Sequence, residues 1–254
     1  MKIGVISGHR ISGFIKNSEK IIVETTFGDV PIELAKFGEH EIFFISRHGE
    51  KANIPPHNIN YRANIQALSA SHVDSIFSVG TVGSMNKAIQ PGDFIIPHDF
   101  IDFTKSRPLT FFEDSRIHVD MTDPFCPALR KLLVDSCKKI WDIVSHEKGA
   151  YLSTEGPRLE TASEIKLFSN FADIVGMTLV PEIVLAREKG ICYASLCVVC
   201  NMVTGLQNEL TVDEISGMYA KKEPLVLEVL QSTIESISNK GNCNCKRDLS
   251  KATL

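Results

Sequence analysis

The chain has 254 residues and a formal net charge of −4, with 43% hydrophobic and 23% charged residues. This composition is typical of a globular protein with a large core, and the slight negative charge does not suggest a nucleic-acid-binding surface. The apolar runs are too short to span a bilayer, and the N-terminus has no signal-peptide pattern. We therefore expect a cytoplasmic protein whose partners are neither nucleic acid nor membrane.

The predicted elements follow one another without a linker rich in Ser, Gly or Pro, which indicates one α/β domain over residues 1–238. Apolar or alternating runs predict strands at 2–6, 20–25, 30–37, 41–46, 74–79, 94–97 and 191–200. Helical spacing predicts helices at 58–70, 126–144 and 211–238, the second with Trp141 in its core stripe. The aperiodic stretch 104–123 is expected to form a long loop, and residues 239–254 a mobile tail.

In the first half of the chain, groups suited to an anion follow three predicted strands. The loop that contains His9 has small residues that let backbone N–H groups approach an oxyanion. Arg47 and His48 follow the fourth strand, and a bidentate donor beside a titratable donor suits a phosphate dianion. Gly80 and Thr81 begin a turn after the fifth strand, where glycine allows a ligand close to the backbone. A surface arginine beside a structural histidine is the alternative interpretation of residues 47 and 48.

Residues 151–201 read as strand, helix, short strand, helix and long apolar strand, with a polar group at each junction. Thr161 and Glu164 form a capping-box pattern, which leaves Glu160 outside the helix and free to face a cavity. Thr178 precedes the second helix, where free N–H groups and the helix dipole attract an anion. Asn201 follows the long strand at its carboxyl end, where open α/β sheets bind ligands. Singly, each also has an ordinary explanation as a cap or turn residue.

Three runs in this half carry a family resemblance: E-G-P-R-L-E-T-x-x-E from Glu155, G-M-T-x-V-P-E from Gly176 and A-R-E-K-G-I-C-Y-A-S from Ala186. Shorter matches are R-H-G from Arg47, N-Y-R-A-N-I from Asn60, Q-P-G-D from Gln90 and D-P-F-C-P from Asp123. Together they resemble the purine nucleoside phosphorylase and 5′-methylthioadenosine phosphorylase family, from the first strand to about Ser236. The resemblance, closest to the methylthioadenosine branch, implies a single-domain nucleoside phosphorylase fold with a central twisted mixed β-sheet flanked by helices.

The resemblance also implies the reaction, phosphorolysis, in which inorganic phosphate is a co-substrate that attacks the anomeric carbon of a nucleoside. No metal or organic cofactor is expected. Phosphate must be held, the sugar positioned, and the departing purine relieved of its growing negative charge, which is the catalytic role of Asn201. By position in the family, the phosphate ligands are His9, Arg47, His48, Gly80, Thr81 and Thr178, and the nucleoside contacts are Glu160, Met177, Asn201, Met202, Val203, Val212 and His118.

The phosphate loop departs from the family pattern. Where relatives carry Gly-Thr-Gly or Gly-Ser-Gly, this chain has Gly8-His9-Arg10. A pair of cationic groups can still hold phosphate, whereas a bulkier loop can equally change the anion or weaken its binding. A nucleoside hydrolase, or a non-catalytic nucleoside-binding relative, is therefore an alternative, although Arg47 and Thr178 favour an anion site.

Two residues bear on the choice of base. Methylthioadenosine phosphorylases usually carry Ser and Asp where this chain has Glu160 and Asn201. A Glu accepts from the ring N–H that only 6-oxopurines carry, and an Asn amide donates to the 6-oxo group. We therefore expect cleavage of 6-oxopurine nucleosides such as inosine or guanosine in purine salvage, with 5′-methylthioadenosine phosphorylase as the alternative. Val212 takes the position at which 6-oxopurine phosphorylases of the trimeric mammalian type carry a histidine that binds the 5′-hydroxyl. An apolar residue there suits a methylthio group, so 5′-methylthioinosine is a further candidate substrate.

His118, in the long loop, aligns with a family histidine that completes the sugar pocket of a neighbouring subunit. The resemblance thus implies a homo-oligomer, either a trimer or a dimer of trimers. An exposed loop histidine without such a role is the alternative.

The seven cysteines show no pair with zinc-ligand spacing, so we expect no metal site. Cys197 and Cys200 fit a bare C-x-x-C pattern, but their apolar strand favours buried thiols over a redox motif. Cys243 and Cys245 in the polar tail resemble the C-x-C tails of some heat-adapted family members, in which such cysteines are oxidised. The redox state of the tail cysteines stays open.

Overall fold

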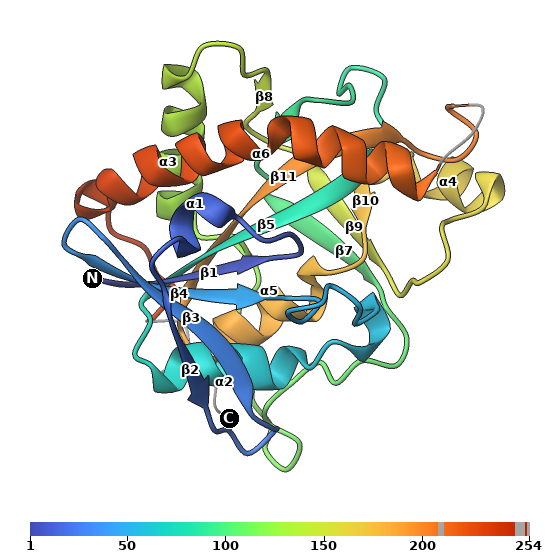
Figure 1. Ribbon diagram of the computed structural model, residues 1–254. Coiled ribbons are helices and arrows are strands. Elements are labelled where there is room, and N and C mark those ends of the chain that lie inside the picture. Colours follow the sequence, from blue (N-terminus) through green and yellow to red (C-terminus); the bar gives the residue numbers. More distant parts are fainter. Residues whose placement is uncertain (208–210, 247–251, 253–254) are drawn as a thin grey trace.

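The computed structural model describes residues 1–207, 211–246 and 252, and in it one mixed β-sheet has helices on both faces (Figure 1). The strands are β1 (Lys2–Ser7), β2 (Glu19–Val23), β3 (Val30–Phe37), β4 (His40–Ser46), β5 (Ser75–Ser84), β6 (Phe94–Ile95), β7 (Asp99–Phe103), β8 (Ser145–His146), β9 (Ala150–Thr154), β10 (Ile174–Gly176) and β11 (Cys192–Met202). The helices are α1 (Ser12–Ile15), α2 (Tyr61–Ala70), α3 (Pro127–Lys139), α4 (Ala162–Phe168), α5 (Leu179–Glu188) and α6 (Val212–Glu235), with 3-10 turns η1 (Pro56–Asn58) and η2 (Ile237–Asn239). The predicted α/β class is confirmed.

The centre of the sheet consists of parallel strands whose carboxyl ends meet at one edge. The main path runs β2-β3-β4-β1-β5-β10-β9-β7, while β11 pairs with β5 and with β6, which in turn pairs with β8. The register aligns Ser7 of β1 with Ser46 of β4 and with Val79 of β5. Beyond this line β5 and β11 continue together as far as Ser84 and Met202. The prediction of a turn at residues 80–84 is therefore wrong, because pairing with β11 keeps this segment extended.

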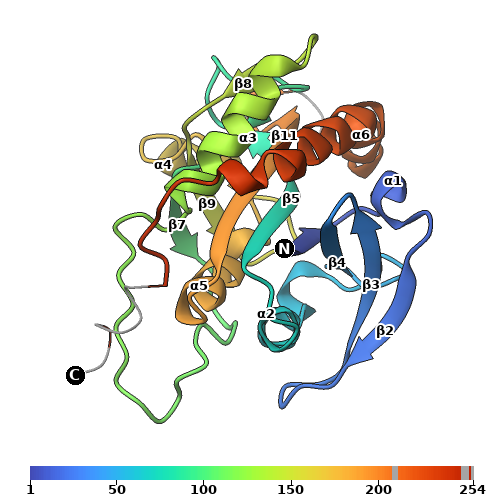
Figure 2. The same ribbon diagram turned by 90° about the vertical axis from the view of Figure 1, so that its left-hand side faces the viewer.

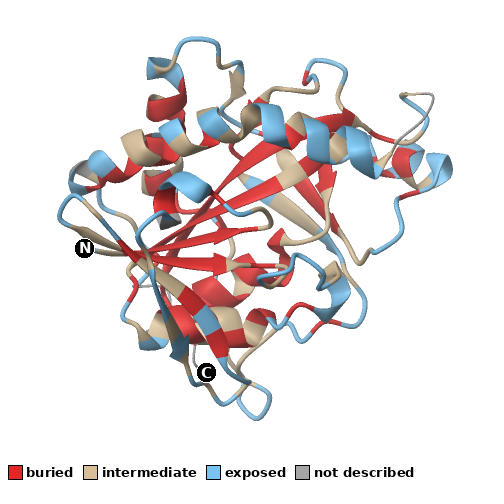
Figure 3. Cartoon of the chain, viewed as in Figure 1, coloured by how far each residue is buried: buried red, intermediate tan, exposed pale blue. Residues whose placement is uncertain are grey.

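Two apolar clusters cover the two faces of the sheet. On one face, α3 and α6 pack over the central strands, and on the other face lie α2 and α5 (Figure 2). Every residue of β11 from Cys192 to Asn201 is buried, and β5 is buried over most of its length (Figure 3). Continuous burial on both faces explains the unbroken apolar sequence of the long predicted strand.

The helix boundaries follow local sequence signals. Thr161 accepts a hydrogen bond from the Glu164 backbone N–H and forms the predicted capping box of α4, and Thr211 caps α6 in the same way. Helix α3 ends at Lys139, before the predicted end at residue 144, because the next residue has an extended conformation. Trp141 is 93% exposed, so its predicted place in the core stripe is wrong. None of the described helices is long and apolar enough to cross a membrane.

The described part of the C-terminal tail lies against the body of the domain. Cys245 is buried, and the Lys246 ammonium lies 2.9 Å from Oδ1 of Asp74. The backbone N–H of His118 donates to the carbonyl of Ala252 at 2.9 Å. The tail therefore contacts both the amino end of β5 and the long loop at residues 104–126.

Candidate active site

A cavity of about 230 Å³ opens at the carboxyl edge of the central strands. This is the edge at which open α/β sheets bind ligands, and the continued parts of β5 and β11 form one wall. The opposite wall comes from the segment before α5 and from the loop before α4. The cavity is lined by Gly8, His9, Arg47, His48, Pro56, Gly80, Thr81, Val82, Gly83, Pro157, Leu159, Glu160, Val175, Gly176, Met177, Thr178, Asn201, Val203, Thr204 and Ile215.

Arg47 forms the floor of one end of the cavity. Its Nε donates to Oε2 of Glu182 at 2.8 Å, and its Nη2 donates to Oε1 at 2.9 Å. Nη1 donates to the carbonyl of Val79 at 3.0 Å. Burial alone would lower the pKa of Arg47, but the Glu182 carboxylate and its hydrogen bonds raise it. The guanidinium is therefore a permanent positive charge, fixed in place before any anion arrives.

His9 and His48 lie beside this guanidinium. The ring of His9 stacks on Tyr219 with centroids 4.0 Å apart. Nδ1 of His48 donates to the carbonyl of Ile54 at 2.7 Å, which leaves Nε2 for the cavity. Burial lowers the pKa of both rings, and the positive charge of Arg47 lowers it further. The two imidazoles thus lie beside the Arg47–Glu182 ion pair, and an anion bound there would favour their protonated forms.

Thr178 sits at the N-cap position of α5, as predicted, but its hydroxyl does not cap the helix. The backbone N–H of Thr178 instead donates to the Tyr151 hydroxyl at 3.2 Å. A Cβ built on Gly80 would lie 4.0 Å from Thr178 Oγ1, so glycine keeps this part of the cavity open. Thr178 and Thr81 therefore line the same cavity as Arg47, with the Thr178 hydroxyl free of a capping contact.

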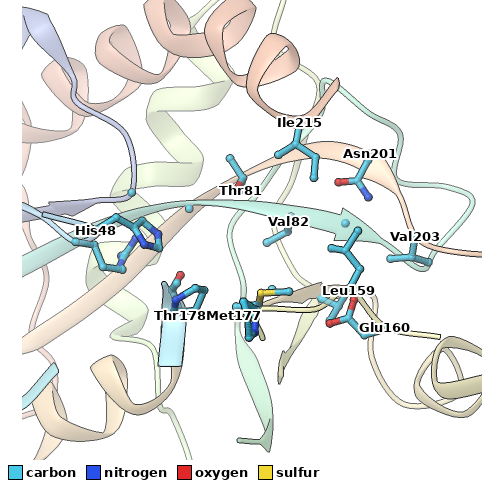
Figure 4. A pocket seen from close by; sticks show the side chains of 18 of the residues that line it. His48, Thr81, Val82, Leu159, Glu160, Met177, Thr178, Asn201, Val203 and Ile215 are labelled. Atoms are coloured by element: carbon cyan, nitrogen blue, oxygen red, sulfur yellow. The ribbon is translucent and has the colours of Figure 1, made fainter. Parts of the chain in front are cut away.

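Glu160 and Asn201 lie at the other end of the cavity, together with Val203 (Figure 4). Both polar side chains are largely buried, at 9% and 7% exposure. The Thr154 hydroxyl donates to Oε1 of Glu160 at 2.6 Å, and this is the one hydrogen bond that the described residues provide to the carboxylate. Nδ2 of Asn201 donates to the carbonyl of Met202 at 2.9 Å. One N–H of the amide, its oxygen and Oε2 of Glu160 are left for a ligand.

Arg107, which no sequence pattern indicated, holds the two loops that carry Glu160 and Thr178. Its Nη1 donates to the carbonyls of Met177 and Val180 at 2.7 and 2.6 Å. Its Nη2 donates to the carbonyls of Thr154 and Glu155 at 3.2 and 2.7 Å. The side chain is buried and does not line the cavity. Arg107 therefore fixes the segment before α5 relative to the end of β9.

The structure brings together most of the predicted site residues, but not all of them. The predicted residues that line the cavity are His9, Arg47, His48, Gly80, Thr81, Glu160, Met177, Thr178, Asn201 and Val203. Val212 is 77% exposed and lies outside the lining, whereas Ile215, from the next part of α6, lines the cavity. Met202 contributes its backbone to the Asn201 contact, and His118 is exposed on the long loop, away from the lining of its own chain.

Two features of the sequence could have indicated further residues. Glu182 is the one charged residue in the apolar stretch from Leu179 to Ala186 of α5, and such a residue needs a cationic partner when buried. Ile215 lies three residues after Val212, within one turn of the same helix. The rotation of α6 decides which of the two faces the cavity, and the sequence does not fix this rotation.

Comparisons with known proteins agree with the geometry. The profile of the Phosphorylase superfamily matches residues 2–235. The chain is 42% identical to the probable S-methyl-5′-thioinosine phosphorylase of Methanocaldococcus jannaschii, covering 99% of both chains. It is also 42% identical to the probable 6-oxopurine nucleoside phosphorylase of Dictyoglomus turgidum, covering 98% of this chain and 97% of the relative. A crystal structure of a methylthioadenosine phosphorylase from an antarctic soil metagenomic library has a TM-score of 0.94 at 32% identity, covering 99% of this chain and 92% of that one. The chain therefore belongs to the phosphorylase superfamily and is an enzyme.

Proposed function

We propose that the enzyme cleaves 6-oxopurine nucleosides with inorganic phosphate, releasing the purine base and a pentose 1-phosphate. The observation that carries this proposal is the division of one cavity into two ends. His48 and Thr178 lie at one end, whereas Glu160 and Asn201 lie at the other (Figure 4). Nη1 of Arg47 and the ring of His48 both lie beside Gly8, which makes the first end cationic. A nucleoside between the two ends presents its anomeric carbon to a phosphate on one side and its base to the two polar groups on the other.

The cationic end would hold phosphate against the sugar. The charge of Arg47, hydrogen bonds from Nε2 of a protonated His48, and the hydroxyl of Thr178 all favour a dianion. Attack by a phosphate oxygen on the anomeric carbon forms the new C–O bond as the bond to the base breaks. The positive charge that develops on the sugar is stabilised by the bound dianion. Met177 lines the cavity between the two ends and would pack against the ribose.

The other end would select the base. Oε2 of Glu160 can accept from N1–H, which a 6-oxopurine carries and a 6-aminopurine lacks. The remaining N–H of the Asn201 amide can donate to the purine, whose ring gains negative charge as the glycosidic bond breaks. A 6-aminopurine would place the lone pair of its N1 against the carboxylate. A buried site that leaves polar groups unpaired in this way rejects the wrong base by orders of magnitude.

The 5′ end of the sugar would face an apolar wall. Ile215 lines the cavity from α6. Such a wall suits a methylthio group, so 5′-methylthioinosine is a substrate candidate beside inosine and guanosine. The names of similar proteins include both a methylthioinosine phosphorylase and a 6-oxopurine nucleoside phosphorylase. Methylthioadenosine phosphorylase is the second candidate, favoured by the same wall and by the name of the similar crystal structure.

A product assay distinguishes these functions. The purified enzyme is incubated with inosine, guanosine, 5′-methylthioinosine or 5′-methylthioadenosine, with and without phosphate, and free base is measured by chromatography. We expect base release to require phosphate and kcat/KM for the best 6-oxopurine substrate to exceed that for 5′-methylthioadenosine by about 100-fold or more. Release without phosphate would indicate a hydrolase, and equal or faster cleavage of 5′-methylthioadenosine would refute the base assignment.

We also propose that the enzyme works as a homo-oligomer, either a trimer or a dimer of trimers. Exposed apolar side chains occur on segments that line the cavity or adjoin its lining residues, including Leu159, Leu206 and Val212, and a neighbouring subunit would cover them. His118, exposed on the long loop, would reach the sugar site of a neighbouring copy. Light scattering measures the mass in solution, and an active monomer would contradict this proposal.

A further inference from the structure

The buried guanidinium of Arg107 contacts a third segment of the cavity wall besides the two whose carbonyls it binds. Its Nη1 donates to the Tyr61 hydroxyl at 3.0 Å, and this hydroxyl donates to the carbonyl of Pro56 at 2.9 Å. Pro56 lines the cavity, and the carbonyl of Ile54, two residues earlier, accepts the hydrogen bond from Nδ1 of His48. Arg107 is therefore connected, through Tyr61, to the segment that orients His48.

The same three segments touch one another at the cavity. A Cβ built on Gly156 would lie 2.6 Å from Sδ of Met177 and 3.6 Å from Cβ of Pro56. Gly156 also has a φ of +65°, which favours glycine. Close packing at this point means that a shift of one segment displaces the others.

The four carbonyl groups around Arg107 require a planar fork of donors. Nη1 serves Met177 and Val180, and Nη2 serves Thr154 and Glu155. A lysine has one nitrogen atom at its end and cannot reach both pairs at once. Loss of the fork would leave carbonyl groups of both segments without their donor, which favours a shift of the backbone.

The loop that carries Arg107 is itself fixed by Glu155. Oε2 of Glu155 accepts from the backbone N–H of Lys105 at 2.6 Å, and Oε1 accepts from the Ser106 hydroxyl at 3.1 Å. Oε1 also lies 3.6 Å from Nε of Arg107. The guanidinium is thus held in place by protein groups alone, so the cavity wall is organised before a ligand binds.

We propose that Arg107 is a positioning residue for both ends of the cavity, although it touches neither ligand. The proposal rests on the proposed function, which assigns an anion to one end and a purine base to the other. Thr178 belongs to one of the connected segments, and Glu160 follows another, where Thr154 donates to it at 2.6 Å. Replacing Arg107 should therefore weaken anion binding and base binding together, whereas a residue within one end affects that end.

Binding measurements on folded protein test this proposal. Sulfate is the probe for the anion end and hypoxanthine the probe for the base end, and isothermal titration calorimetry is carried out well below the Tm of each variant. In Arg107→Lys, both dissociation constants should rise about 10-fold or more, and kcat/KM should fall about 100-fold. A change in stability alone leaves the dissociation constants of the folded molecules unchanged.

Arg130→Lys is the matched control. Arg130 also connects two segments through backbone carbonyls, since its Nε donates to Pro97 at 2.9 Å and its Nη2 donates to Glu147. Both of these residues lie outside the cavity lining. The control should leave both dissociation constants unchanged.

Two further measurements do not depend on the lysine variant. Tyr61→Phe keeps the ring but removes the hydroxyl between Arg107 and Pro56, so it should weaken sulfate and leave hypoxanthine unchanged. In Arg107→Ala, added methylguanidinium should raise kcat/KM, whereas methylammonium at the same concentration should not, because it lacks the fork.

An unchanged dissociation constant at either end in Arg107→Lys would overturn the proposal, and so would equal rescue by the two cations. Tight hypoxanthine binding in Tyr61→Phe with unchanged sulfate binding would overturn the connection to the His48 segment. A wild type that binds adenine in place of hypoxanthine would instead contradict the proposed function, and the same comparison with adenine would still test Arg107.

Discussion

Replacing Glu160 by glutamine keeps the size of the side chain but removes its charge. The Thr154 hydroxyl donates to Oε1 at 2.6 Å, so the amide of Glu160→Gln should keep its oxygen at this position. Its Nε2 then occupies the place of Oε2 and faces the ligand as a donor. With a 6-oxopurine, the glutamine N–H would face the N1–H of the base, so two donors would oppose each other. With a 6-aminopurine, the glutamine N–H can donate to the lone pair of N1.

The expected magnitude follows from the contact that is lost. A hydrogen bond to a charged group contributes about 1.5–3 kcal/mol, and each 1.36 kcal/mol is a tenfold change in rate. In Glu160→Gln, kcat/KM for inosine or 5′-methylthioinosine should therefore fall about 10- to 150-fold. The value for 5′-methylthioadenosine should stay the same or rise.

The assay compares kcat/KM for one substrate of each class in the wild type and the variant. Glu164→Gln is the matched control, because Glu164 belongs to the same segment but caps α4 and pairs with Arg158 outside the cavity. This control should leave the ratio of the two substrates unchanged. Equal losses for both substrates in Glu160→Gln would refute the reasoning, since they would mean that Glu160 does not distinguish the bases.

Two further predictions concern the anion end. Glu182→Gln leaves the fully buried Arg47 guanidinium without its partner, so the free energy of unfolding in urea should fall by about 3–5 kcal/mol. Glu50→Gln, which removes an exposed pair with Lys20, is the control and should cost about 1 kcal/mol or less, and a similarly small loss in Glu182→Gln would contradict the role of the buried pair. The second prediction follows from the lowered pKa values of His9 and His48. The ordinary pKa of histidine is 6.5, and as pH falls from that value the unfolded chain binds protons that the folded chain does not. Without an anion, the free energy of unfolding should therefore decrease as pH falls toward the lowered pKa values. Sulfate, a dianion throughout this range, should raise Tm more at about pH 6 than at about pH 8, and a pH-independent sulfate effect would argue against anion binding beside the two histidines.

Signals that act within a few residues allowed correct predictions from the sequence. The capping pattern of Thr161 and Glu164 depends on adjacent backbone groups, and the structure contains it. Thr178 at the start of α5 and Asn201 near the end of β11 were likewise placed by local patterns. Because parallel strands end at one edge of the sheet, these local positions also predicted that the residues would meet.

The remaining features depend on long-range packing. Gly80 and Thr81 read as a turn, but pairing with β11 continues the strand through them. Arg107 lies in an aperiodic loop, and its role appears only when the carbonyls of two distant segments surround it. The convergence of Cys126, Cys192, Cys243 and Cys245 was missed for the same reason, since it arises only when three distant parts of the chain pack together.

The position of Arg47 has a consequence for how the protein folds. Its guanidinium contacts the backbone of β1 and β5 and the carboxylate of Glu182, which is 135 residues away in the sequence. Loop closure over such a separation is slow, and the contact orients the guanidinium only once these elements have docked. An intermediate with β1, β4 and β5 assembled but α5 undocked would hold this arginine without its counterion. Thr178 stands at the N-cap of the same helix, so the complete set of proposed anion ligands would form only in the final docking step, after the central strands are buried.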